Sequence, residues 1–195
     1  MLVKICGLSE EQHVDAAINA GASAVGFVFA DSVRRVDPDR AKEICLNVPK
    51  HIKRIAVMLH PSNDDWQEVL ESFAPDVLQT DVADFAALEV PESVERWPVY
   101  REGQKSPDTD GVFVYEGRNS GQGETVDWTA AARHAEHGRM ILAGGLGAHN
   151  IVAAVTAVRP FGVDVSTGVE TAPGRKDSNL ISEFVSAALA AEKDL

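Results

Sequence analysis

Short apolar runs alternate with helical patterns along the whole chain. Between several of the runs, apolar residues recur at i, i+3, i+4 and i+7, as they do at Ala41, Ile44, Cys45 and Val48, which places them on one helix face. The apolar runs are typical of buried strands and lie at residues 3–6, 24–29, 54–59, 76–81, 97–100, 111–116, 140–143 and 163–165. This alternation predicts parallel strands joined by right-handed crossovers.

Local signals mark where several helices begin. Ser9 and Gln12 have the spacing of a capping box, and Gly21 is suited to end the helix that follows. Asp37 and Pro38 fit an N-cap and a first helical residue. Further helices are expected at 66–73, 127–137, 150–158 and 180–188, with only a helical turn at 85–88 and a polar segment, too short for a helix, at 101–110.

Eight strand and helix units are the number that closes a (βα)8 TIM barrel. The α/β fold predicted here is a compact barrel that forms a single domain over residues 1–195, with an abbreviated helical connection around the fifth strand. The chain is short for such a barrel, so its connections must be minimal. An open doubly wound sheet is the alternative that periodicity alone leaves open.

Two glycine-containing turns follow the seventh and eighth strands. Gly144 and Gly145 form the first turn, and Ser166, Thr167 and Gly168 form the second. Loops at these two positions of a barrel commonly bind phosphate through backbone N–H groups and hydroxyls. We therefore expect these five residues to bind phosphate; tight-turn geometry alone is the other explanation for the glycines.

Charge and composition limit the possible partners. The net charge of −12 and pI of about 4.8 argue against binding to nucleic acid or anionic membranes. No apolar stretch is long enough for a transmembrane helix, no secretory signal is recognisable, and the two cysteines, Cys6 and Cys45, suggest free thiols. We expect a cytoplasmic protein with a small anionic ligand; the sequence does not indicate an oligomeric state.

Side-chain alternation along the strands predicts which polar residues face the barrel interior. Lys4 and Cys6 share one face of the first strand, Asp164 and Ser166 share one face of the eighth, and Glu116 shares a face with two valines of the sixth. Because strands one and eight become neighbours when a barrel closes, we expect Lys4 and Asp164 to form a structural ion pair.

Six motifs resemble, in order and at matching intervals, those of the phosphoribosylanthranilate isomerase family. The resemblance covers nearly the whole chain. The motifs are Lys4-Ile5-Cys6-Gly7-Leu8; Gly26 to Phe29 followed by Ser32 to Val36; Gln79; Gly121-Gln122-Gly123 with Val126-Asp127-Trp128; Ala143 to Leu146; and Val163 to Glu170 with Pro173-Gly174-Arg175-Lys176-Asp177.

The resemblance implies an aldose–ketose isomerase of tryptophan biosynthesis that works without metal or cofactor. Its phosphorylated substrate, N-(5-phosphoribosyl)anthranilate, rearranges to 1-(2-carboxyphenylamino)-1-deoxyribulose 5-phosphate. An acid protonates the ribose ring oxygen to open the ring, and a base then removes the C2 proton. The resemblance makes Cys6 the base, which would act as a thiolate favoured by nearby cations or N–H dipoles.

Other site residues follow from the same resemblance, with departures. Glu116 stands where the family has an aspartate acid, and its extra methylene moves the carboxyl group. Arg34 matches an arginine near the anthranilate carboxylate, although the usual preceding proline is Val33. Gln79 is expected to bind substrate, and Asp81 stands where the family has a histidine, adding a carboxylate near an anionic substrate.

Some alternatives remain open at the level of sequence. Arg35 could take the role of Arg34, and the six histidines form no metal-binding pattern, so His134 and His137 are expected on a solvated face. A different sugar-phosphate isomerase or epimerase would use the same phosphate site. A non-catalytic or altered-specificity sugar-phosphate-binding paralogue would explain the changed acid.

Overall fold

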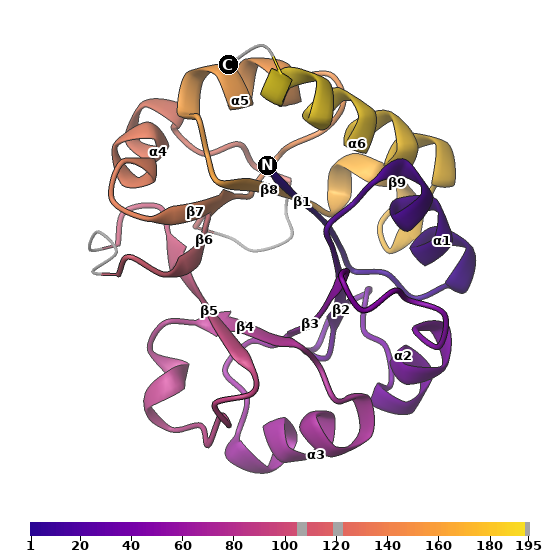
Figure 1. The fold of residues 1–195 in the computed structure, drawn as a ribbon. Helices are drawn as coiled ribbons and strands as arrows, with labels where there is room; N and C mark the ends of the chain where they lie inside the picture. Colours follow the sequence, from indigo (N-terminus) through magenta and orange to yellow (C-terminus); the bar gives the residue numbers. More distant parts are fainter. Residues whose placement is uncertain (105–108, 119–122, 194–195) are drawn as a thin grey trace.

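Eight parallel strands close into a barrel in the order β1 to β8, as Figure 1 shows along the barrel axis. The computed structural model describes residues 1–104, 109–118 and 123–193. The strands are β1 (Leu2–Cys6), β2 (Ala24–Val28), β3 (Lys53–Val57), β4 (Val77–Asp81), β5 (Glu95–Arg101), β6 (Val112–Glu116), β7 (Arg139–Leu142) and β8 (Gly162–Val165). The predicted (βα)8 class is confirmed, and the open sheet is excluded because β1 pairs with both β2 and β8.

The helices lie in a ring outside the strands (Figure 1). They are α1 (Glu11–Ala20), α2 (Pro38–Ile44), α3 (Asn63–Phe73), α4 (Trp128–Ala135), α5 (Ile151–Val158) and α6 (Ser178–Lys193). Only the 3-10 turn Asp84–Ala86 connects β4 to β5, and the described residues between β5 and β6 contain no helix. Both connections of β5 are thus abbreviated. Within the described ranges, no helix has the length and apolarity needed to cross a membrane.

Side chains on the two faces of the strands form two separate hydrophobic clusters. One fills the barrel interior and includes Ile55, Trp97 and Val114, whereas the other lies between strands and helices and includes Phe113. The alternation of Val114 inward and Phe113 outward leaves Glu116 on the inner face, as predicted. Glu116 therefore faces the interior at the carboxyl end of β6.

Helix boundaries follow the sequence signals in one case and depart from them in another. Asp37 caps α2, accepting a hydrogen bond from the Asp39 N–H at 3.0 Å, as expected, although α2 ends at Ile44. The capping box proposed from Ser9 is wrong. Glu10 is the N-cap of α1 without a side-chain cap, and Gln12 instead donates to the Glu10 carboxylate.

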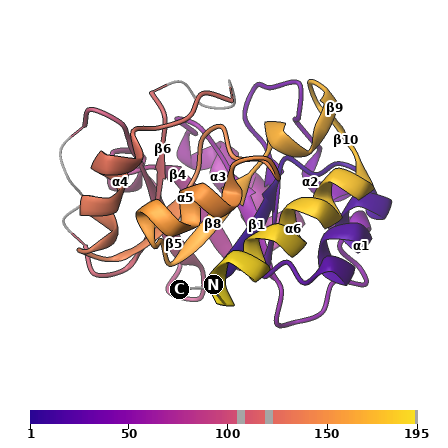
Figure 2. The same cartoon turned by 90° about the horizontal axis from the view of Figure 1, so that it is seen from above.

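A short antiparallel hairpin after β8 was not predicted. It consists of β9 (Glu170–Ala172) and β10 (Arg175–Lys176), and it follows a 3-10 turn at Thr167–Val169. Seen from the side, the hairpin lies at one end of the barrel and the two termini at the other (Figure 2). The hairpin thereby returns the chain to the end where the strands finish.

Lys4 and Asp164 form the predicted ion pair inside the barrel. They are register partners on β1 and β8, and the Lys4 Nζ lies 2.6 Å from the Asp164 Oδ2. Lys4 is completely buried. Although burial acts to lower it, the carboxylate of Asp164 raises the pKa of Lys4, so the lysine stays charged.

Replacing Lys4 with methionine is expected to destabilise the fold by about 3 to 5 kcal/mol, because it leaves the Asp164 carboxylate buried without its cation. Urea unfolding of wild type and variant measures the difference. Lys53→Met is the matched control, since Lys53 pairs with Glu95 on the surface and such pairs contribute less than about 1 kcal/mol. Equal losses in the two variants would contradict a structural role for the buried pair.

Candidate active site

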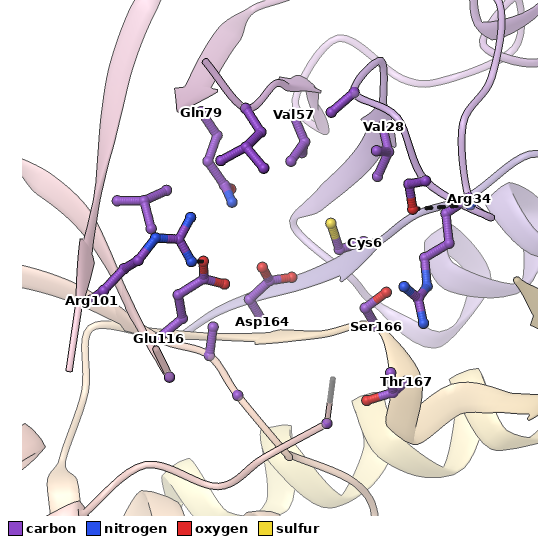
Figure 3. A pocket seen from close by; sticks show the side chains of 18 of the residues that line it. Cys6, Val28, Arg34, Val57, Gln79, Arg101, Glu116, Asp164, Ser166 and Thr167 are labelled. Carbon is purple, nitrogen blue, oxygen red and sulfur yellow. Dashed lines mark hydrogen bonds and ion pairs between the residues drawn. The ribbon is translucent and has the colours of Figure 1, made fainter. Parts of the chain in front are cut away.

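A cavity of about 210 Å³ opens at the carboxyl ends of the strands. Figure 3 shows Cys6, Gln79, Glu116 and Ser166 around it, on side chains that come from different strands. Nine of the ten residues selected from the sequence line this cavity: Cys6, Arg34, Gln79, Asp81, Glu116, Gly144, Gly145, Ser166 and Thr167. Gly168 follows Thr167 in the second turn and is not part of the lining.

The two glycine turns present a set of backbone donors to one side of the cavity. Within the described residues, the backbone N–H groups of Gly144, Gly145, Thr167 and Gly168 have no hydrogen-bond acceptor. Gly145 has φ +60°, and a Cβ on Gly168 would lie 2.0 Å from the carbonyl oxygen of Leu146. The two turns therefore pack too closely for side chains at these positions, and their N–H dipoles are suited to an anion.

Cys6 lies at the end of β1 with its sulfur directed into the cavity (Figure 3). Burial is the main cause that raises the pKa of the Cys6 thiol, and the Asp164 carboxylate acts in the same direction. The cations Lys4 and Lys176 oppose this shift but do not overcome it. The thiolate expected from nearby cations is therefore not the resting form of this side chain.

Arg34 reaches the cavity from the loop after β2 and is held by Glu170. Its Nε and Nη2 donate to the two Glu170 oxygens at 2.7 and 2.9 Å. Lys176 donates to the same carboxylate at 2.8 Å and to the Ser166 hydroxyl at 3.1 Å. Although burial acts to raise it, the hydrogen bonds from Arg34 and Lys176 lower the pKa of Glu170, so this carboxylate stays charged.

Glu116 and Asp81 meet on a residue that the sequence did not indicate, Arg101 of β5. Arg101 Nη1 lies 2.5 Å from the Glu116 Oε1, and its Nη2 lies 2.6 Å from the Asp81 Oδ1. The side chains of the three residues are between 14% and 16% exposed. Asp81 is thus paired with a cation, so it does not confront an anionic substrate with an isolated negative charge.

Two buried oxygens in the cavity lack hydrogen-bond partners among the described residues. They are the Asp164 Oδ1 and the Gln79 Oε1. Both side chains line the cavity, and the other Asp164 oxygen is occupied by Lys4. Because an unsatisfied buried acceptor costs free energy, these atoms are suited to accept hydrogen bonds from a ligand.

Other sequence expectations have different outcomes. Gly121 and Gln122 lie outside the described residues, and Asp127 caps α4 through hydrogen bonds from Thr129 and Ala130. Arg35 does not line the cavity that contains Arg34. The rings of His134 and Tyr115 pack against each other with 4.9 Å between their centroids, so His134 does not lie on a purely solvated face. The described part of the chain contains no group of three metal-ligating side chains.

Arg101 and Lys176 are two residues at or near the cavity that sequence reasoning did not assign. Trp97, Val99 and Arg101 alternate on the inner face of β5, so extending the strand by one residue would have placed Arg101 at the cavity. Lys176 belongs to a quoted motif, but it reaches Ser166 only because the hairpin turns back over the barrel. No local sequence pattern indicates the contact between Lys176 and Ser166.

Comparisons with known proteins agree on one family. Residues 3–187 match the family model of N-(5'phosphoribosyl)anthranilate (PRA) isomerase. The chain is 35% identical over 211 residues to N-(5'-phosphoribosyl)anthranilate isomerase of Listeria welshimeri, covering 98% of this chain and all of that protein. It is also 36% identical over 210 residues to the Bordetella parapertussis isomerase, covering 95% and 94% of the two chains.

Solved structures of phosphoribosyl anthranilate isomerases are also similar to this chain. A phosphoribosyl anthranilate isomerase in complex with reduced 1-(o-carboxyphenylamino)-1-deoxyribulose 5-phosphate matches with a TM-score of 0.80 at 26% identity, covering 97% of this chain and all of that one. TrpF from Jonesia denitrificans matches with a TM-score of 0.81 at 31% identity, covering 98% of each chain. The chain belongs to the N-(5'-phosphoribosyl)anthranilate isomerase family.

Proposed function

We propose that this chain isomerises N-(5-phosphoribosyl)anthranilate to 1-(2-carboxyphenylamino)-1-deoxyribulose 5-phosphate, with Cys6 as base and Glu116 as acid. The observation that carries the assignment of roles is the shared cavity. Cys6 and Glu116 enter it from β1 and β6, and the donor-rich turns after β7 and β8 lie beside them (Figure 3). One substrate can therefore contact an acid, a base and a phosphate site together.

The phosphate occupies the turns formed by Gly144, Gly145, Ser166, Thr167 and Gly168. Backbone N–H groups bind it without adding formal charge, which suits a chain of net charge −12. Fixing this non-reacting end places the ribose carbons between Cys6 and Glu116. Binding energy from the phosphate is then used to orient the reacting atoms.

The reaction proceeds by two proton transfers. Glu116, in its protonated form, donates to the ribose ring oxygen while the bond from C1 to that oxygen breaks and the nitrogen lone pair forms an iminium. Cys6, as a thiolate, removes the C2 proton, the electrons of that C–H bond form the C1–C2 double bond of the enolamine, and the π electrons of the iminium return to nitrogen. The enolamine then tautomerises to the ketone.

The orphan acceptors support a hydroxyl-bearing substrate. Gln79 Oε1 and Asp164 Oδ1 are buried in the cavity and lack donors among the described residues, and ribose hydroxyls are donors. Asp164 lies close to Cys6 and Gln79 lies on another part of the cavity wall, so the two oxygens are suited to holding the sugar from two sides near the base (Figure 3). An apolar ligand would leave both oxygens unsatisfied.

Arg34 provides the site for the anthranilate carboxylate. Its Nε and Nη2 are used by Glu170, and its Nη1 has no acceptor among the described residues. Arg34 and Lys176 together carry one more positive charge than Glu170 removes. That excess favours a second anion at this side of the cavity.

Expression of the chain should restore growth without tryptophan to an auxotroph that lacks this isomerase. In steady-state assays, Cys6→Ser and Glu116→Gln should each lower kcat by at least about a hundredfold, because each removes one proton-transfer group. Cys45→Ser is the matched control, since Cys45 caps α2 outside the cavity and should leave turnover intact. Full turnover in either site variant would refute that role.

The two thiols should ionise only at alkaline pH. Burial raises the pKa of Cys6 above its ordinary value and that of Cys45 to about 12. Thiolate absorbance near 240 nm should therefore stay flat through neutral pH in the wild type, in Cys6→Ser and in Cys45→Ser. A step near pH 7 that depends on Cys6 would contradict the buried, protonated resting state.

Gly168→Ala should weaken the phosphate site, because the new Cβ would force apart the two turns that form it. We expect KM and the inhibition constant of inorganic phosphate to rise in parallel by about tenfold, from the loss of about 1.4 kcal/mol of binding. Gly111→Ala is the control, since its Cβ meets only the Thr109 hydroxyl, at 3.1 Å, before β6 begins. Unchanged phosphate inhibition in Gly168→Ala would place the phosphate elsewhere.

A further inference from the structure

We infer that Arg101 is a positioning residue, which holds the acid Glu116 in place through a guanidinium that Asp81 anchors from the other side. The inference rests on the function proposed above. It assigns a task to three charged groups, of which only Glu116 takes part in the proton transfers. It also explains why this chain carries a carboxylate, Asp81, on the wall of a cavity for an anionic substrate.

The three residues come from neighbouring strands, which fixes their relative positions. Arg101 and Glu116 are register partners on β5 and β6, and Asp81 ends the adjacent strand β4. Arg101 donates to the two Asp81 oxygens at 2.6 and 3.2 Å and to Glu116 at 2.5 Å. Because the guanidinium is planar, binding both Asp81 oxygens sets the direction in which its Nη1 points.

The carboxyl group of a glutamate needs to be fixed in position by a neighbouring residue more than that of an aspartate does. Its additional rotatable bond lets the carboxyl group occupy more positions, and a displacement of about 1 Å can cost about a hundredfold in rate. The contact with Arg101 selects one of these positions at the cavity wall. Asp81 in turn keeps Arg101 from following Glu116 or from turning toward a substrate anion.

The same contacts set the charge of Glu116. Arg101 favours the carboxylate form, whereas Asp81 offsets part of the positive charge of Arg101. Among the described residues that line the cavity, the other ionisable groups at this side are Asp164 of β8, which is paired with Lys4, and Glu124 after β6. His60, in the loop after β3, brings its Nε2 to 3.9 Å from the Asp81 Oδ2, and β1 contributes Cys6. The turn after β7 adds only glycines and apolar residues to the lining.

Two substitutions should shift the pH dependence of turnover in opposite directions. Cys6 keeps its proton over the pH range in which Glu116 titrates. The acidic limb of the plot of kcat/KM against pH therefore reports the protonation of Glu116. Arg101→Met removes the cation and should move this limb to higher pH by about one unit. Asp81→Asn removes the opposing anion and should move it to lower pH.

The kinetic constants should separate positioning from substrate binding. Arg101→Met should lower kcat by up to about tenfold, because a positioning loss of up to about a hundredfold is partly offset by a larger protonated fraction of Glu116, and it should change KM by less than about twofold. Arg101→Lys should fall between wild type and Arg101→Met, because an ammonium cannot bridge both carboxylates in a fixed plane. Arg96→Met is the matched control, since Arg96 lies near the other end of β5 and donates to the Val90 carbonyl.

A second measurement does not depend on turnover. The titration midpoint of the Glu116 carboxyl carbon, assigned by its loss in Glu116→Gln, can be followed by carbon-13 NMR in each ligand-free variant. It should rise in Arg101→Met and fall in Asp81→Asn. Midpoints that stay unchanged or move in the same direction would overturn the inference, and so would a large rise in KM at constant kcat.

The failure of the inference is distinguishable from failure of the proposed function. An inactive wild-type enzyme would refute the isomerase assignment and remove any acid for Arg101 to position, whatever the NMR titrations show. An active wild type that needs Glu116 but keeps its kcat and acidic limb in Arg101→Met would refute only the role of Arg101.

Discussion

The closure of the barrel on a buried ion pair determines how the active end is arranged. Lys4 and Asp164 are register partners on the first and last strands, and because Lys4 is completely buried and Asp164 almost so, water is a poor replacement for either partner. Their pairing fixes β1 against β8, so that Cys6 and Ser166, each two residues further along, lie side by side at the cavity. The pair also leaves one Asp164 oxygen directed at the ligand space.

The strands and most site residues could be predicted because both depend on local patterns. An apolar run defines a strand, alternation defines its inner face, and the residues that end it, such as Cys6 and Glu116, must lie at one rim. Arg101 was not assigned because its role depends on carboxylates from two other strands. The capping box at Ser9 failed because Glu10 took the N-cap position, a one-residue difference that propensity does not resolve.

The proposed mechanism needs Cys6 and Glu116 in protonation states opposite to those that the resting site favours. Burial keeps Cys6 protonated and the contact with Arg101 favours the charged form of Glu116, whereas the mechanism proposed above needs a thiolate and a carboxylic acid. The resting form has a thiol and a carboxylate, and the reactive form has a thiolate and a carboxylic acid, so both hold the same number of protons. The ratio of the two forms therefore does not change with pH between the titration of Glu116 and that of Cys6. Because Cys6 keeps its proton at low pH, the low-pH limb of the profile then follows the titration of Glu116, the proposed acid.

The end of the cavity proposed to bind phosphate and the end that holds Glu116 differ in their chemistry, and this explains where the chain departs from the family pattern. The two glycine turns present backbone N–H groups, whose placement depends on close packing at Gly145 and Gly168. The end that holds Glu116 uses side chains, and two departures, Asp81 and Glu116, bind the same guanidinium. The longer side chain of Glu116 and the new carboxylate of Asp81 are each unfavourable alone, but both bind the one guanidinium of Arg101, so they are best understood as a single change.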